Sequence, residues 1–184
     1  MLVAVALMMV SSLGFAQSLG LHEVGGGLGY VSASVTGSST ESVGGFVFAA
    51  HANLGEVSKG ITLFPEIQYW SASKDISGGT WKVSDFAINA NIHYDLEMEG
   101  AVKPYVGAGL GFNSFSFDYT IPGATFFGFG GTYSVTATRI GINLLAGANY
   151  KMNDQMSLFL EPRYVLASDF NHFQIKVGAT FAMK

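Results

Sequence analysis

Six ionisable residues of this 184-residue chain fall where an alternating side-chain pattern would turn them to the same strand face as glycine, asparagine and glutamine. They carry both signs in equal number: Glu66, Asp85, Arg139, Glu161, Arg163 and Lys176. Charges that share a narrow interior could form a gate or a proton path, or they could pair into a plug of salt bridges. We favour the plug, because an unpaired charge in such an interior is costly.

Two histidines suggest a second kind of chemistry. His51, His93 and Asp95 occupy alternating positions predicted to face inward, near one end of their strands. Such groups could bind a metal ion or act as a general base. Another strand separates the two that carry the histidines, so the sequence does not establish that they converge. Because no cluster of serine, histidine and acid is visible either, we expect no catalytic residue, metal site or cofactor. An enzyme that acts on lipid is kept as an alternative.

The longest predicted connection, residues 120–132, holds apolar side chains among glycines. They are Ile121, Phe126, Phe127 and Phe129. Apolar side chains on an exposed loop either bind something apolar or fold back over the protein. We predict that they form an interaction site, the alternative being a loop that packs over the mouth of the fold.

The strands that must position these residues are clearest at residues 103–113. One face, from Val106 to Phe112, is apolar throughout, and the other, from Gly107 to Asn113, is made of glycine and asparagine. A soluble half-buried strand would turn its large apolar residues inward and its polar residues to water. The observed pattern is instead typical of a barrel strand that crosses a membrane.

Eight segments repeat this alternation, and every second connection between them is short. The segments are residues 20–35, 43–54, 61–73, 81–96, 103–119, 133–151, 156–168 and the stretch from 172 onward. A polar loop is predicted at residues 74–80, and Pro65, which lacks a donor, predicts a bulge or a missing bond in the third strand. Short turns on one side and longer loops on the other characterise membrane barrels. The sequence therefore predicts an all-β fold, an eight-stranded antiparallel up-and-down transmembrane barrel.

Composition supports a membrane location and excludes several classes of protein. Hydrophobic residues make up 49% of the chain and charged residues only 12%, which is too little charge for an ordinary water-soluble surface. Past residue 17 no apolar run is long enough for a spanning helix, so a closed barrel is the way to pair every backbone group in lipid. The net charge of −4 gives no electrostatic footprint for nucleic acid. The absence of cysteine excludes disulfides and thiolate metal sites.

The first sixteen residues resemble a secretory signal. An apolar core is followed by small residues at Gly14 and Ala16, as at a signal-peptide cleavage site. We expect residues 1–16 to be removed and residues 17–184 to form one domain. An N-terminal membrane anchor is the less favoured alternative, because the apolar stretch is short.

Taken together, these patterns resemble the small eight-stranded outer-membrane barrels of Gram-negative bacteria, the family that includes the OmpA transmembrane domain and OmpX. The residues that carry the resemblance are the signal-like start, residues 64–69, 104–111 and 161–164, and a final amphipathic strand.

The resemblance implies a monomer in the cell outer membrane, in contact with lipid and lipopolysaccharide and inserted by the outer-membrane assembly machinery. Family members commonly end on an aromatic residue that this machinery reads, whereas this sequence ends with Phe181-Ala182-Met183-Lys184. Either Phe181 serves instead, or the terminus is shifted. The function we expect is a structural or surface-interaction role; the lumen charges predict a largely plugged lumen, and the aromatic loop predicts a surface ligand. A narrow channel for small or hydrophobic solutes is the alternative.

Overall fold

Eight long strands form a closed antiparallel barrel. The computed structural model describes residues 19–35, 42–76, 78–121, 131–168 and 170–183. The strands are β1 (Glu23–Val35), β2 (Ser42–Asn53), β3 (Glu56–Ser58), β4 (Ile61–Ile76), β5 (Gly79–Asp95), β6 (Val102–Ile121), β7 (Gly131–Lys151), β8 (Met156–Ala167) and β9 (Phe170–Ala182).

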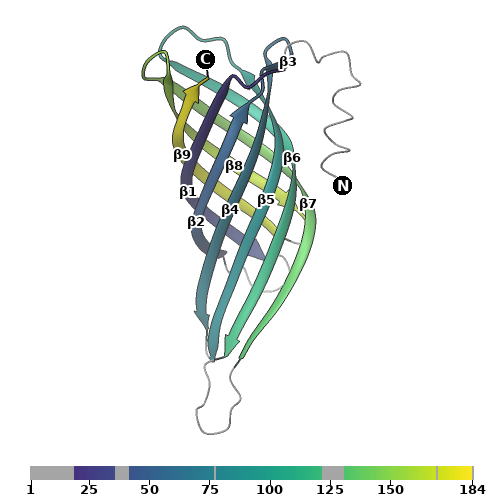
Figure 1. Cartoon of the computed structure of the whole chain (residues 1–184). Helices are drawn as coiled ribbons and strands as arrows, with labels where there is room; N and C mark the ends of the chain where they lie inside the picture. Colours follow the sequence, from purple (N-terminus) through teal and green to yellow (C-terminus); the bar gives the residue numbers. More distant parts are fainter. Residues whose placement is uncertain (1–18, 36–41, 77, 122–130, 169, 184) are drawn as a thin grey trace.

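The pairing of the strands follows their order in the chain. Each long strand pairs with the next, β1 pairs with both β2 and β9, and a β2–β4 ladder completes the ring. The short β3 pairs with β4 beside this ring (Figure 1). The predicted all-β, eight-stranded antiparallel barrel is therefore confirmed. Within the described residues, no helix is long and apolar enough to cross a membrane.

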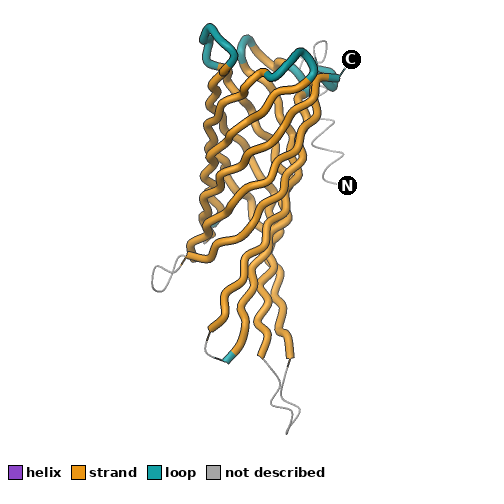
Figure 2. The backbone as a smooth tube through the Cα atoms, turned by 90° about the vertical axis from the view of Figure 1, so that its left-hand side faces the viewer, coloured by secondary structure: helices purple, strands orange, loops and turns teal. Residues whose placement is uncertain are grey.

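The two ends of the barrel differ. The start of β1, the end of β9 and the connections at residues 54–60, 96–101 and 152–155 lie together at what we call the turn end, uppermost in Figure 1. At the opposite, loop end, four strands continue beyond the other four (Figure 2), and Figure 1 identifies them as β4 to β7. There β7 pairs with β6 from residue 131 but with β8 only from Gly141. We call this four-stranded continuation the extension sheet.

The polar stretch predicted as a loop at residues 74–80 is mostly strand, so that prediction is wrong. β4 and β5 stay paired as far as Ile76 and Gly79. Gly78 has a φ of 99°, which permits a tight reversal, and the Thr80 hydroxyl donates to Asp75 at 2.7 Å. Asp75 and Thr80 are cross-strand partners on the outer face of the extension sheet, which is polar.

Pro65 lies at the end of a ladder. The β2–β4 ladder extends from Ala72 to Glu66 and stops before Pro65, whereas the β4–β5 register continues through it without a shift. The proline ring thus occupies a position where no β2 partner needs its missing N–H.

A belt of exposed apolar side chains surrounds the barrel. Phe46 and Ile140 are 70% and 71% exposed and face outward. Toward the loop end the belt stops at the partners Tyr69 on β4 and Phe86 on β5, and at the partners Phe112 on β6 and Ile140 on β7. Beyond it the outward residues of these strands are mainly serine and threonine. This belt marks the part of the wall that faces lipid.

The interior contains a large apolar cluster that the sequence patterns did not predict. It fills the half of the lumen nearer the loop end, with Trp81 and Phe117 packed against it. We call it the apolar layer; its buried members are Val31, Ala33, Val43, Val47, Trp70, Ala72, Val83, Phe115, Ala167 and Phe170. The inward face is thus mainly polar toward the turn end and mainly apolar toward the loop end.

The lipid-facing belt gives the first test. Leu144→Arg places a charge near the middle of the belt and should destabilise the folded barrel by about 2–4 kcal/mol. Thr138→Arg, on the same strand and face but beyond the belt, is the matched control and should change stability by less than ~1 kcal/mol. Equilibrium unfolding in lipid vesicles measures both; equal effects would contradict the assignment of the belt.

Candidate functional site

Four charged side chains meet in the lumen, and we call them the ion layer. Glu66 comes from β4, Glu161 and Arg163 from β8, and Lys176 from β9, and all four are at most 5% exposed. Arg163 Nη1 lies 2.5 Å from Glu66 Oε1, and Arg163 Nη2 lies 2.8 Å from Glu161 Oε1. Lys176 Nζ contacts Glu66 Oε2 at 2.5 Å and Glu161 Oε1 at 3.1 Å. Two carboxylates thus neutralise two cations.

Strand order explains why these residues meet. β4 and β8 lie on opposite sides of the ring, with three strands between them in either direction, and an eight-stranded barrel is just wide enough for side chains to span it. Glu161 and Arg163 are two residues apart, so both point inward. Lys176 is the direct cross-strand partner of Glu161.

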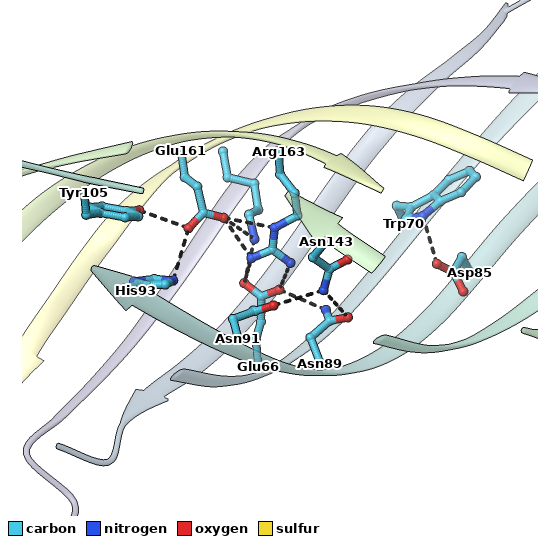
Figure 3. A network of polar contacts seen from close by, with 11 residues as sticks. Glu66, Trp70, Asp85, Asn89, Asn91, His93, Tyr105, Asn143, Glu161 and Arg163 are labelled. Atoms are coloured by element: carbon cyan, nitrogen blue, oxygen red, sulfur yellow. Dashed lines mark hydrogen bonds and ion pairs between the residues drawn. The ribbon is translucent and has the colours of Figure 1, made fainter. Parts of the chain in front are cut away.

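Amide and hydroxyl groups satisfy the remaining lone pairs of this layer. Asn89 Nδ2 donates to Glu66 Oε1 at 3.1 Å, and Tyr105 donates its hydroxyl to Glu161 Oε2 at 3.0 Å. Asn143 Nδ2 in turn donates to Asn89 and Asn91, each at 3.0 Å (Figure 3). Buried charges are tolerated when such bonds complete their coordination, so the network can hold the lumen shut without an uncompensated charge.

Two of the six predicted lumen residues do not join the ion layer. Asp85 is fully buried but lies apart, where the Trp70 indole donates to its Oδ2 at 3.2 Å (Figure 3). Arg139 is exposed, and its Nη1 donates to the Thr138 carbonyl at 3.0 Å. The placement of Arg139 in the lumen is therefore wrong. It has inward parity but precedes Gly141, where β7 first pairs with β8, so no opposite wall encloses it.

The predicted loop site is only partly within the described residues. Ile121 is the last residue of β6 and is half-buried. Phe126, Phe127 and Phe129 lie outside the described residues.

A cavity of about 330 Å³ opens from the turn end and reaches the ion layer. His51, His93, Tyr105 and Phe159 line its walls, and Glu66 and Glu161 are among its deepest residues. Water can therefore approach the charges from one side of the barrel.

An aromatic ring separates the two histidines of the cavity. Phe64 stacks on His93 with ring centroids 4.0 Å apart and lies 6.1 Å from His51. His51 Nε2 instead lies 3.3 Å from the Thr180 hydroxyl. In the described part of the chain, no group of three or more His, Cys, Asp or Glu is arranged to hold a metal ion.

On its loop side the ion layer is followed by the apolar layer. The Trp70 and Phe170 rings are nearly parallel, with centroids 6.0 Å apart, and Phe115 packs 5.0 Å from Phe170. Sequence reasoning missed this second barrier, although Val31, Trp70 and Phe115 all have inward parity. Following the inward residues along the whole length of each strand would have revealed it.

Sequence comparison identifies one matching family. Residues 2–181 match the family model of the outer membrane protein beta-barrel domain. No curated protein shows a significant match to the chain.

Several solved structures are similar in fold. Neisserial surface protein A is 21% identical over 88% of this chain and 96% of that chain, with a TM-score of 0.65. The attachment invasion locus protein Ail of Yersinia pestis is 13% identical over 89% and 100%, with a TM-score of 0.52. A major outer membrane protein of Thermus thermophilus is 12% identical over 86% and 99%, with a TM-score of 0.51. At these identities the likeness shows the fold alone.

The ion layer can be tested with a double-mutant cycle. Glu66→Gln leaves two buried cations facing one carboxylate and should destabilise the barrel by about 3–5 kcal/mol. Adding Lys176→Met restores neutrality, so the double variant should be more stable than Glu66→Gln alone. Unfolding titrations measure the cycle.

The exposed pair Lys151–Asp154, whose Nζ and Oδ1 lie 2.7 Å apart, supplies the control for this cycle. Lys151→Met should cost less than ~1 kcal/mol. A Glu66→Gln effect no larger than that of Lys151→Met would show that the four buried charges do not depend on one another.

Proposed function

Because this chain belongs to the outer membrane protein β-barrel domain family and is a protein of the outer membrane, we propose that it has a structural or surface-interaction role in the bacterial envelope. Its barrel wall carries that role, and its lumen does not conduct. The observation that supports this most directly is the double closure of the lumen, by the ion layer and by the apolar layer.

The two layers oppose permeation in different ways. An ion that enters from the turn-end cavity meets four charges that already satisfy one another. Beyond them, the rings of the apolar layer offer a solute few polar partners other than the buried Asp85 and His172, and hydrophobic constrictions exclude water as well as ions. A narrow channel would require both layers to rearrange. For this reason we favour the structural or surface-interaction role over a channel.

The polar chemistry of the lumen also favours a non-enzymatic role. Hydrolysis needs a nucleophile, a base and a group that orients the base. The contact between His51 and Thr180 supplies the first two. The third requirement is a group that orients the base. Among the described residues, no carboxylate is hydrogen-bonded to the His51 ring to meet it.

The partners we propose follow from the apolar belt and from the loop end of the barrel. Lipid and lipopolysaccharide cover the apolar belt, the assembly machinery inserts the chain, and a surface ligand binds at the loop end. Ail has been crystallised with a heparin analogue, sucrose octasulfate, and a barrel of this fold can therefore present a ligand site. For this chain, we propose that the connection between β6 and β7, with Ile121, Phe126, Phe127 and Phe129, contributes to binding.

Export completes the proposal. We propose that residues 1–16 are a signal peptide and that the mature protein begins at Gln17. N-terminal sequencing of protein recovered from outer membranes would check this cleavage site.

Planar-bilayer recordings test the closed lumen. The wild type should show no steady conductance. Glu66→Ala/Lys176→Ala, which stays neutral, and Trp70→Ala/Phe115→Ala should each remain closed, because each leaves one layer in place. The variant that combines all four substitutions should conduct.

Tyr69→Ala, beside Trp70 but on the lipid face, is the matched control, and a heat-modifiable gel shift shows that each variant is folded. A stable open pore in the wild type would overturn the proposed role.

The loop site has a separate test. Replacing Phe126, Phe127 and Phe129 by serine should leave the barrel folded, because the described β6–β7 ladder ends at Ile121 and Gly131. Attachment to lipopolysaccharide-containing vesicles should weaken, since exposed apolar area is lost. A triple variant that fails to fold, together with undetectable binding by wild type, would show that the loop packs over the barrel instead.

A further inference from the structure

The cavity at the turn end is large enough to hold a small molecule. Its volume of about 330 Å³ falls near the lower end of the range for ligand pockets, roughly 300–1,000 Å³. The short turns of outer-membrane barrels face the periplasm, so the cavity opens to that compartment. Because the ion layer and the apolar layer close the lumen behind it, a molecule that enters from the periplasm can be held there but not passed on.

One wall of the cavity is a stack of three rings from neighbouring strands. Phe64 on β4 and His93 on β5 have ring centroids 4.0 Å apart, and Tyr105 on β6 stacks on His93 at 4.6 Å. On β8, Phe159 adds a further ring, 5.2 Å from that of His51. All five side chains line the cavity. Rings held against one another in this way give a rigid, partly apolar surface.

His93 also has an unbonded polar atom beside the floor of the cavity. The residue is only 7% exposed, and within the described part of the chain its Nε2 has no hydrogen-bond partner. Glu161 Oε2 lies 4.0 Å away (Figure 3), which is beyond hydrogen-bond distance. This oxygen accepts one bond, from the Tyr105 hydroxyl, and it has room to accept another. A ligand hydroxyl between Nε2 and Oε2 would bond to both.

The charges of the cavity favour a neutral ligand. Its lining includes five carboxylates and three cations, a balance that repels an anion. At the floor, Glu66 and Glu161 already contact Arg163 and Lys176. A further cation beside them would be buried without a partner of its own, which is costly.

Neutral donors and acceptors line the cavity above its floor. They are the hydroxyls of Ser157 and Thr180 and the amides of Asn149 and Gln155, all of which can both donate and accept. An acyl chain would cover these groups without bonding to them, which is unfavourable. A sugar ring fits the mixture better, because its faces carry C–H groups and its rim carries hydroxyls.

We propose that the turn-end cavity binds a neutral sugar ring from the periplasm, with one ligand hydroxyl between His93 Nε2 and Glu161 Oε2 and an apolar face of the ring against Phe64 and Phe159. The ring is either a free sugar or the end of a glycan chain. This inference goes beyond the proposed structural or surface-interaction role. It also fails independently of that role, because the bilayer recordings and the loop-binding test do not involve the cavity walls.

NMR titrations test the site. The refolded full chain, labelled with ¹⁵N at histidine, is prepared in a phosphocholine detergent, which has no sugar head group to compete. Glucose should bind with a dissociation constant of about 1 mM, as a ligand of this size can give. It should shift the ring-nitrogen signals of His93 but not those of His172, which is not among the residues that line the cavity.

A series of related sugars tests the preference for a neutral ring. Glucuronate, an anion, should bind at least ~10-fold more weakly than glucose. Glucosamine, a cation at neutral pH, should bind no more tightly than glucose. Maltotriose separates the two sources: binding at least as tight as that of glucose indicates the end of a glycan chain, and weaker binding indicates a free sugar.

Matched variants locate the bound ring. His93→Phe keeps the aromatic stack but removes Nε2, and it should weaken glucose binding roughly 5-fold. His172→Phe changes another buried histidine outside the cavity and should stay within about 2-fold of the wild type. Asn149→Trp narrows the cavity and should abolish binding, whereas Ala148→Trp, its neighbour on the lipid face, should leave binding unchanged. A heat-modifiable gel shift shows that each variant is folded. Asn149 is half-buried, so its variant tests the site even if His93→Phe does not fold.

Any of the following results would overturn the proposal. Glucose leaves the His93 signals unchanged at about 100 mM, which would show that the cavity holds only water. Glucosamine binds at least ~10-fold more tightly than glucose, because the site would then select cations. Folded His93→Phe or Asn149→Trp binds glucose as well as the wild type, because the sugar would then lie elsewhere.

Discussion

The structure depends on one constraint: a closed ring of eight strands leaves an interior narrow enough for side chains to span, and the charges buried in it must be paired. Glu66 and Arg163 reach each other from opposite walls, and Lys176 and Glu161 complete a neutral group. The size of the neighbouring residues follows from this. A Cβ on Gly147 would lie 2.5 Å from the Tyr105 hydroxyl, which donates to Glu161, so only glycine leaves room for that ring.

The same strands meet three surroundings along their length, and their two faces change accordingly. Near the turn end the inner face is polar and reached by water; in the middle the outer face is apolar and meets lipid; beyond the belt the outer face becomes polar while the inner face stays apolar. On β6 the change falls between Phe112 and Ser116. A strand of twenty residues can thus belong to a membrane wall and to a water-exposed sheet.

Much of the fold could be predicted from the sequence, because the period-two alternation defines both the strands and their faces, as at Leu110 and Gly111. The approach of Glu66 to Arg163 followed from strand count alone. The alternation of side chains could not predict how far each strand extends beyond the strands beside it. The inward parity of Arg139 therefore predicts a lumen position that the longer β7 does not provide, and the polar residues around Asp75 suggest a loop because polar residues exposed to water look alike in strand and loop. The apolar layer is not visible in any single strand, because Trp70 and Phe115 come from different strands and meet only in the closed barrel.

The ion layer also bears on how the barrel assembles. Its members are 97 and 110 residues apart along the chain in the pairs Arg163–Glu66 and Lys176–Glu66. Before the ring closes, β4 holds a lone carboxylate, whereas β8 and β9 together hold two cations against one carboxylate. Each part would therefore expose a net charge to the membrane. The ion layer becomes neutral only when the first and last strands join. Closure and charge compensation thus become one late cooperative step, since distant contacts form after local ones, and the network should act chiefly to slow the opening of the finished barrel.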